Sequence, residues 1–141
     1  MVAPVRKVND GSDLFGVVDA LTRDMALAAF ERSNVSNAAG QTLTAAQVLG
    51  GYIERDGATA VSDTLPTAAL FSAAVPGMEV GDCRLLIIRN ANTGTLTIAQ
   101  GNNFTLVGTA TIPTVNTGIF MIRKTAATPA FTATRLLVAA Y

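Results

Sequence analysis

Residues 82–138 read DCRLLIIRNANTGTLTIAQGNNFTLVGTATIPTVNTGIFMIRKTAATPAFTATRLLV. In this tract, short apolar runs are separated by Gly, Asn and Pro, a pattern typical of strands joined by turns. We expect strands at residues 83–89, 96–100, 104–107, 110–112, 119–124 and 131–138. Strands that recur roughly every 8–12 residues favour an antiparallel β-sandwich or a jelly-roll-like barrel. The chain is therefore predicted to be mainly β.

The strands of this tract are of two kinds. Leu96 and Ile98 alternate with threonines, which predicts one buried face and one hydroxyl-lined face. Residues 85–88 and 119–122, in contrast, are apolar at every position. Such runs are typical of strands covered on both sides, here by a second sheet and by a helix or another subunit. Turn-forming residues at 90–94, 101–103 and 116–118 predict hairpins.

The N-terminal part of the chain has a different pattern. We expect residues 1–40 to form an arm and residues 41–141 to form the β-sandwich domain. Within the arm, apolar residues spaced by three and four predict a helix over 12–32, with a short strand at 14–18 as the alternative. Residues 33–42 are small and rich in turn formers, which predicts a linker.

Two further elements are expected between the linker and the β-rich tract. Residues 48–55 predict a strand that bends at Gly50 and Gly51. A short helix is expected to follow, because Thr64 suits an N-cap and Pro66 suits the first turn. Pro76 and the glycine after it would end that helix.

The composition points to a neutral surface. Half of the 141 residues are hydrophobic and only 14% are charged, against about 25% in ordinary soluble domains. Few charges and many small residues suit lasting contact with other protein subunits, with a plain monomer as the alternative. The formal net charge is zero, with ten basic and ten acidic residues, so we expect no nucleic-acid-binding face.

Membrane and export signals are not expected either. No uninterrupted apolar run reaches the roughly 18 residues that a membrane span needs. The N-terminal residues lack the hydrophobic core of a signal peptide. We therefore expect a protein that is made in a cytoplasm and does not bind membranes.

The residue inventory argues against catalysis. The chain contains no histidine and a single cysteine, Cys83, so catalytic triads and histidine or paired-cysteine metal sites are excluded. We expect Cys83 to behave as a small hydrophobe at the start of a strand. Paired carboxylates stay open as a catalytic or calcium-binding set, with Glu54, Asp56, Asp63, Glu79 and Asp82 as the candidates. Each lies in or beside a predicted turn, so we expect no enzyme, no cofactor and no metal.

One part of the chain resembles a known group of proteins. The segments 50–57, 63–70, 80–81, 88–90 and 96–101 (GGYIERDG, DTLPTAAL, VG, IRN and LTIAQG) are similar to a β-domain of structural proteins in tailed bacteriophages. The resembling region is residues 50–138, about two-thirds of the chain, and the Thr64-Leu-Pro-Thr-Ala-Ala piece is its most specific part. It implies a virion component that is typically a homotrimer, such as a capsid decoration (cement) protein. The alternative is a tail or fibre adhesin module that binds a host receptor.

The absence of a long shaft or of repeats favours the decoration protein. Such a protein would bind the major capsid protein on the outside of the capsid and stabilise the shell. Apolar residues of the arm and of the strands are then expected to form its subunit or capsid contacts: Phe15, Leu21, Met25, Leu27, Phe30, Leu86, Ile88, Phe120, Ile122, Leu136, Val138 and Tyr141.

Overall fold

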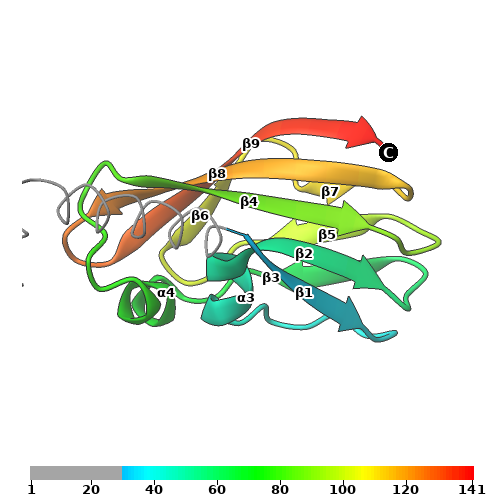
Figure 1. The fold of residues 1–141 in the computed structure, drawn as a ribbon, viewed down its shortest axis with the longest axis horizontal. Coiled ribbons are helices and arrows are strands. Elements are labelled where there is room, and N and C mark those ends of the chain that lie inside the picture. The colour runs from blue at the N-terminus through cyan, green and yellow to red at the C-terminus, as the bar shows by residue number, and fades with distance from the viewer. Residues whose placement is uncertain (1–29) are drawn as a thin grey trace, which may run out of the picture. The chain divides into compact units, whose positions relative to one another are not determined.

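The computed structural model describes residues 30–141 (Figure 1). The expected arm helix and its alternative strand lie almost wholly outside these residues. The last two positions of the predicted helix, Glu31 and Arg32, begin a strand instead. The chain divides into compact units between Phe30 and Glu31, so the β-domain begins about ten residues before the predicted boundary.

The described part contains nine strands and two helices, and the prediction of a mainly β fold is confirmed. The elements in chain order are β1 (Glu31–Ser36), α3 (Ala45–Gly50), β2 (Gly51–Asp56), β3 (Val61–Thr64), α4 (Ala68–Ala74), β4 (Cys83–Asn90), β5 (Leu96–Ala99), β6 (Phe104–Val107), β7 (Thr111–Ile112), β8 (Asn116–Ala126) and β9 (Ala130–Ala140).

The strands form two sheets. The larger sheet has six strands in the order β1-β2-β4-β8-β9-β6, and the smaller has three in the order β3-β5-β7 (Figure 1). Four of the seven strand pairs are parallel: β1 with β2, β2 with β4, β3 with β5, and β6 with β9. The prediction of an antiparallel fold is therefore wrong for these pairs. Consecutive strands such as β4 and β5 enter different sheets, so they do not form the expected hairpin.

The linker predicted at 33–42 is in part a strand. Residues 33–36 belong to β1, which pairs with β2 along its whole length. Its burial pattern has one strongly buried position, Val35, at 3% exposure. A single apolar residue among Ser and Asn gives no alternation to recognise, and long-range pairing with β2 supplies the strand.

The strand predicted over 48–55 begins as a helix. Thr44 caps α3 by accepting from the Gln47 backbone N–H, while the Gln47 side chain accepts from the Thr44 N–H. This reciprocal capping box satisfies two N–H groups that the first helical turn leaves free. Gly51 then ends the helix in the left-handed region, at φ 83°, where glycine carries no steric penalty. The predicted strand is correct from Gly51 onward.

The second predicted helix exists but starts later. Thr64 is the last residue of β3, and Thr67 is the N-cap whose hydroxyl accepts from the Leu70 N–H. Pro66 therefore precedes the helix rather than opening it. The turn expected at 116–118 is also wrong, because these residues are the first three of β8. The chain turns instead just before them, and Val115 has a positive φ of 58°.

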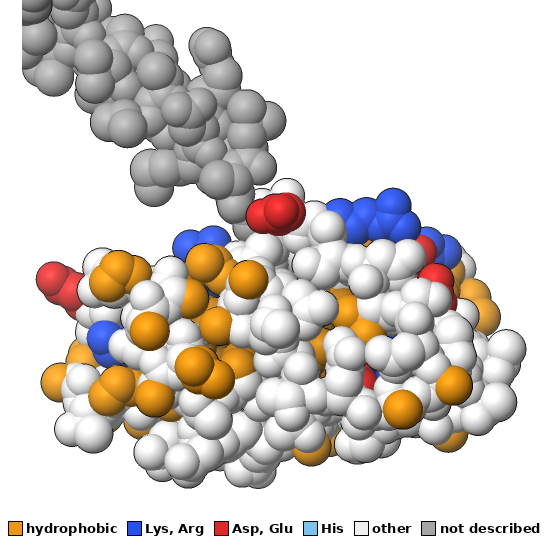
Figure 2. Space-filling model, turned by 90° about the horizontal axis from the view of Figure 1, so that it is seen from below, with side chains coloured by type: hydrophobic (Ala, Val, Ile, Leu, Met, Phe, Trp, Pro, Cys, Tyr) orange, Lys and Arg blue, Asp and Glu red, His pale blue; other side chains and the backbone are white. Residues whose placement is uncertain are grey.

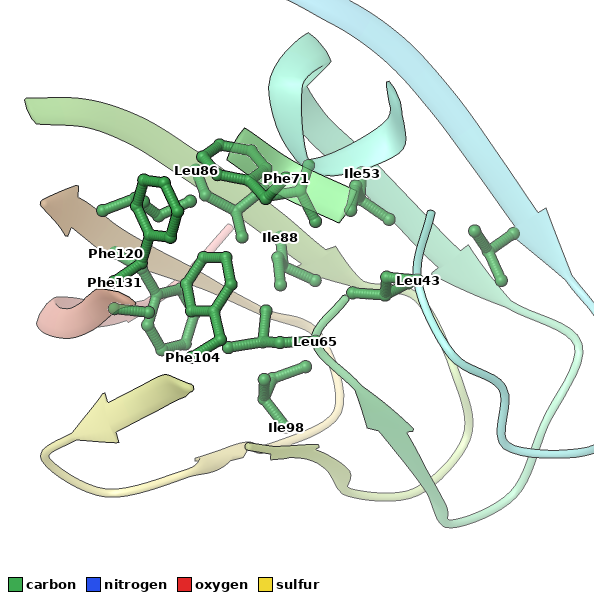
Figure 3. Packing of buried hydrophobic residues seen from close by; sticks show 14 of the residues in the cluster. Leu43, Ile53, Leu65, Phe71, Leu86, Ile88, Ile98, Phe104, Phe120 and Phe131 are labelled. Atoms are coloured by element: carbon green, nitrogen blue, oxygen red, sulfur yellow. The ribbon is translucent and has the colours of Figure 1, made fainter. Parts of the chain in front are cut away.

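One hydrophobic core lies between the two sheets and the helices. One side of the core is a group of phenylalanines, with Phe71 of α4 packed edge-on against Phe104 of β6 and Phe131 of β9 (Figure 3). Ring centroids in this group are 5.0–5.4 Å apart, within the range that favours aromatic pairs. Leu96 and Ile98 reach the same core from the smaller sheet, so the buried half of their predicted alternation is confirmed.

Candidate functional site

The candidate site is the side of the six-stranded sheet that faces away from the core. Strands β4 and β8 alternate strictly in burial, and this separates their consecutive apolar residues into two sets. Leu86 and Ile88, like Phe120 and Ile122, are at most 1% exposed and lie in the core (Figure 3). These four were predicted as contact residues, and that assignment is wrong because their side chains are already covered by the protein itself.

The other apolar residues of the same strands point outward. Leu85 is 44% exposed, and Ile87, Ile119 and Met121 are partly exposed. Strand register places Ile87 opposite Ile119 and Leu85 opposite Met121. The prediction that these strands present apolar side chains on both faces is confirmed. One face is covered by the core.

Neighbouring strands extend this surface. Tyr52 of β2 lies beside Ile87, and Leu137 of β9 lies beside Ile119. A continuous row therefore crosses four strands. We call the surface formed by this row together with Leu85 and Met121 the outer apolar face; its residues are Tyr52, Leu85, Ile87, Ile119, Met121 and Leu137. The row depends on pairing between strands far apart in sequence, so the sequence gives no direct sign of it.

A bulge in β9 adds to the exposed apolar area. The register shifts between Ile119 and Phe120, so that one β9 residue, Leu136, has no partner. Leu136 and Leu137 are consequently both exposed, at 53% and 52%. A bulge changes the direction of a side chain in this way, because two residues of the bulged strand lie opposite one residue of its partner strand. Of the contact residues predicted on β9, Leu136 is exposed, whereas Val138 packs against the core.

Charged residues border the outer apolar face on its β2 side. Glu54 accepts from Arg32 of β1 and from Arg89 of β4, each at 3.2 Å. Arg89 also lies 4.0 Å above the ring of Tyr141, and the Tyr141 hydroxyl donates to the Asn90 carbonyl at 3.0 Å. Tyr141, which was predicted as a contact residue, is thus held on its own chain while remaining 49% exposed.

These interactions affect the ionisation of Arg89. Desolvation lowers the pKa of its guanidinium, but the hydrogen bond to Glu54 and the interaction with Tyr141 act in the opposite direction, and the pKa is raised overall. Arg89 is therefore a permanent cation at the border of the face.

The outward side of the three-stranded sheet is chemically different. Ser62, Thr97 and Thr111 lie side by side across β3, β5 and β7. They carry hydroxyl groups where the other sheet carries Ile and Leu, as the threonine alternation predicted. Most of the surface seen in Figure 2 also belongs to uncharged groups, and its hydrophobic side chains gather toward the end that carries α4.

A second cluster, which the sequence analysis missed, is buried. Arg55 of β2 has no exposed surface and forms an ion pair with Asp63 of β3, 2.7 Å between Nε and Oδ2. Its guanidinium also donates to the carbonyl oxygens of Val35, Asn37, Ala39 and Asp56. Since β2 and β3 belong to different sheets, this cluster joins the sheets and the loop after β1. The alternation of side chains along a strand could have revealed this cluster. It places Arg55 on the same inward side of β2 as Ile53, and Asp63 on the same inward side of β3 as Val61.

The structure accounts for most candidate carboxylates. Glu54 and Asp63 are engaged by arginines, and Asp82 accepts from the Glu79 backbone N–H at 2.9 Å. Within residues 30–141, no group of three or more Cys, Asp or Glu side chains is placed to hold a metal ion. The Asp63 carboxylate in particular serves as the partner of a buried cation.

The remaining predicted residues are distributed as follows. Phe30, just before β1, is 47% exposed, and Phe15, Leu21, Met25 and Leu27 lie outside the described residues. Cys83, expected to behave as a small hydrophobe at the start of a strand, is the first residue of β4 and is exposed. It opens β4 on the same side of the sheet as Leu85.

None of the helices that the structure describes is long and apolar enough to cross a membrane. Comparisons of the chain with protein-family models, with curated proteins and with solved structures find no match.

Proposed function

We propose that this chain is a structural component of a virus particle, a capsid decoration protein that acts without catalysis. In this proposal it binds the major capsid protein on the outside of the capsid as a homotrimer and stabilises the shell. The observation that carries the proposal is the outer apolar face, a contiguous row of apolar side chains across four strands. The virus and capsid parts rest on the resemblance of residues 50–138 to β-domains of phage structural proteins.

An exposed apolar row of this kind favours an assembly role. Single exposed apolar residues are normal on protein surfaces, but contiguous apolar patches mark contacts with other molecules. Burial of apolar area is worth about 25 cal/mol per Å2. Many copies on a shell would repeat such a contact, so modest individual interfaces would stabilise the whole particle.

The fold suits this role as a rigid platform. Two sheets that enclose one core favour the description as a β-sandwich. The parallel pairs depart from a jelly roll, whose strands are antiparallel. The buried Arg55–Asp63 pair joins the sheets, so a load applied to one sheet would be carried to the other.

Binding to a shell tests the proposal directly. Shells assembled from the major capsid protein of the virus whose genome encodes this chain are incubated with the purified chain, pelleted, and imaged by electron microscopy. We expect the chain to pellet with the shells, to occupy their three-fold positions and to raise the temperature at which the shells break. A chain that stays in the supernatant at micromolar concentration would refute the proposal.

The adhesin alternative makes a different prediction. It requires aromatic or carboxylate clusters on loops, where a receptor can reach them. Among the described residues, Tyr52 lies on strand β2 and Glu54 is held between two arginines. The observations therefore favour the decoration protein.

A further inference from the structure

We propose that copies of this chain meet through the outer apolar face, so that this face of each copy is covered by another copy in the trimer. This inference rests on the proposed function, because it identifies the surface through which the subunits of the decoration protein associate. The partner to which we commit is a second copy of this chain.

The layout of the face is that of a subunit interface. Its centre, Ile87 and Ile119, is apolar and partly exposed, and Leu85, Met121 and Leu137 surround that centre. Ionic groups stand at its border: Glu54 with its two arginines lies on one side, and Arg123 lies at the end of the row on β8. Interfaces commonly combine an apolar centre that is depleted of charge with a polar rim.

The size of the sheet fits a stable contact. Six strands spaced by about 4.8 Å and averaging about eight residues, at about 3.3 Å per residue, give the whole outward side of the sheet an area of roughly 750 Å2. A standard interface buries about 800 Å2 on each partner. A contact of this size would use most of this side of the sheet, with the outer apolar face as its centre and the charged border as its rim.

Charge also permits contact between copies. The chain has ten basic and ten acidic residues and a formal net charge of zero, so two copies do not repel each other at long range. The border of the face carries both signs, with Glu54 between Arg32 and Arg89.

The two sheets provide an internal comparison. The outward side of the three-stranded sheet carries Ser62, Thr97 and Thr111, residues that water solvates well. The outward side of the six-stranded sheet carries Ile and Leu at equivalent strand positions. The two outward sides belong to the same chain, so the apolar character of the six-stranded sheet's outward side does not follow from the overall composition.

Disulfide trapping provides the first test and uses the full chain. Cys83 is replaced by Ser to remove the natural thiol, and Ile119→Cys then places a thiol at the centre of the face. Ser62→Cys in the same background is the matched control, because Ser62 is exposed on the opposite sheet. Under mild oxidation we expect linked dimers from the Ile119→Cys chain and essentially none from the control. Equal yields from both would overturn the inference.

Mass in solution provides the second test. Leu85→Lys should raise the dissociation constant of the oligomer at least about tenfold, since a lysine would have to be desolvated in the contact. Thr97→Lys, on the hydroxyl-lined sheet, should leave the mass unchanged. If Leu85→Lys prevents folding, the double variant Leu85→Thr/Leu137→Thr replaces it, because threonine suits a strand. An oligomer that persists in a folded outer-face variant would overturn the inference.

Shell binding separates this inference from the proposed function. A chain that pellets with shells but is monomeric in solution would overturn the inference and leave shell binding intact. A chain that forms oligomers through this face but does not bind shells would support the inference and refute the decoration role.

Discussion

Replacing Asp63 by alanine should destabilise the protein more than any change at a surface ion pair. The change leaves the Arg55 guanidinium, which is fully buried, without its counter-charge. Breaking a buried ion pair by removing one partner costs about 3–5 kcal/mol, because the other charge stays uncompensated. The Gln41 backbone N–H also loses its acceptor, which lies 3.0 Å away. We expect a loss of about 4 kcal/mol, a large part of the roughly 5–15 kcal/mol that stabilises a typical domain.

Urea denaturation of the full chain measures this loss. With a slope of about 2 kcal/mol per M for a domain of this size, the midpoint should fall by roughly 2 M. Glu54→Ala is the matched control, because it breaks two ion pairs with arginines that are exposed to water, where such a pair is worth about 0–1 kcal/mol. Asp63→Ala and Glu54→Ala each remove one carboxylate from a strand, so they differ mainly in burial.

A double-mutant cycle isolates the pair. Arg55→Leu alone leaves the buried Asp63 carboxylate and several carbonyl oxygens without donors, so it should be at least as harmful as Asp63→Ala. In the double variant the uncompensated charge is gone, and the loss should be smaller than the sum of the single losses by about 2–3 kcal/mol. A loss below about 1 kcal/mol for Asp63→Ala, or strictly additive single losses, would refute this account of the cluster.

Three further outcomes are expected. Deletion of residues 1–29 should leave a folded domain, whereas deletion of residues 1–40 should unfold it, since the longer cut removes β1 and the Asn37 and Ala39 acceptors of Arg55; circular dichroism and urea titration compare the two. Phe71→Ala should cost about 3–5 kcal/mol by opening a cavity among three rings, and equal stability to wild type in a thermal melt would contradict this. Gly101→Ala should destabilise strongly, because a Cβ there would lie 2.1 Å from the Pro66 carbonyl oxygen, while Gly77→Ala, with nothing within 4 Å, should be neutral in the same melt.

Local patterns in the sequence predicted those strands whose signal is local. Strands β4, β5, β6 and β9 lie close to their expected positions because apolar runs between turn formers need no partner to be recognised. The alternation at Leu96 and Ile98 also predicted correctly which side chains enter the core. Strand β1 has no such run, and only its register with β2 makes it a strand.

The errors have identifiable physical origins. Parallel pairing is decided by which distant strands meet, and turn composition carries no information about it. Helix α3 was missed although its capping box, Thr44-Ala-Ala-Gln47, is legible in the sequence. The prediction instead treated Gly50 and Gly51 as a bend within a strand. Gly51 is in fact the left-handed cap of the helix, which is a second local signal of the same element.

The sequence indicated which strands carry apolar residues on both faces, but the prediction assigned buried residues of these strands to the contact surface. Apolar runs at 85–88 and 119–122 correctly indicated two apolar faces, but they do not state which residues take which face. One strongly buried residue shows which side chains of a strand point inward, because successive side chains point to opposite faces of the sheet. Asn90 provides that neighbour for β4, since its side-chain amide donates to the buried Ile112 carbonyl at 2.8 Å. Leu86 and Ile88 share its side of the sheet, and Leu85 and Ile87 are left outside.

The apolar residues left outside are the feature on which the proposed assembly role rests. Isoleucine or leucine contributes less on a solvated strand face than on a buried one, and the three-stranded sheet of this chain has serine and threonine at such positions. The six-stranded sheet instead keeps Ile87, Ile119 and Leu137 in register across three strands. Exposed apolar rows of this kind promote association with any apolar surface, so a protein that stayed alone would be better served by threonine. A partner that covers the row removes this liability and gains the free energy of burial.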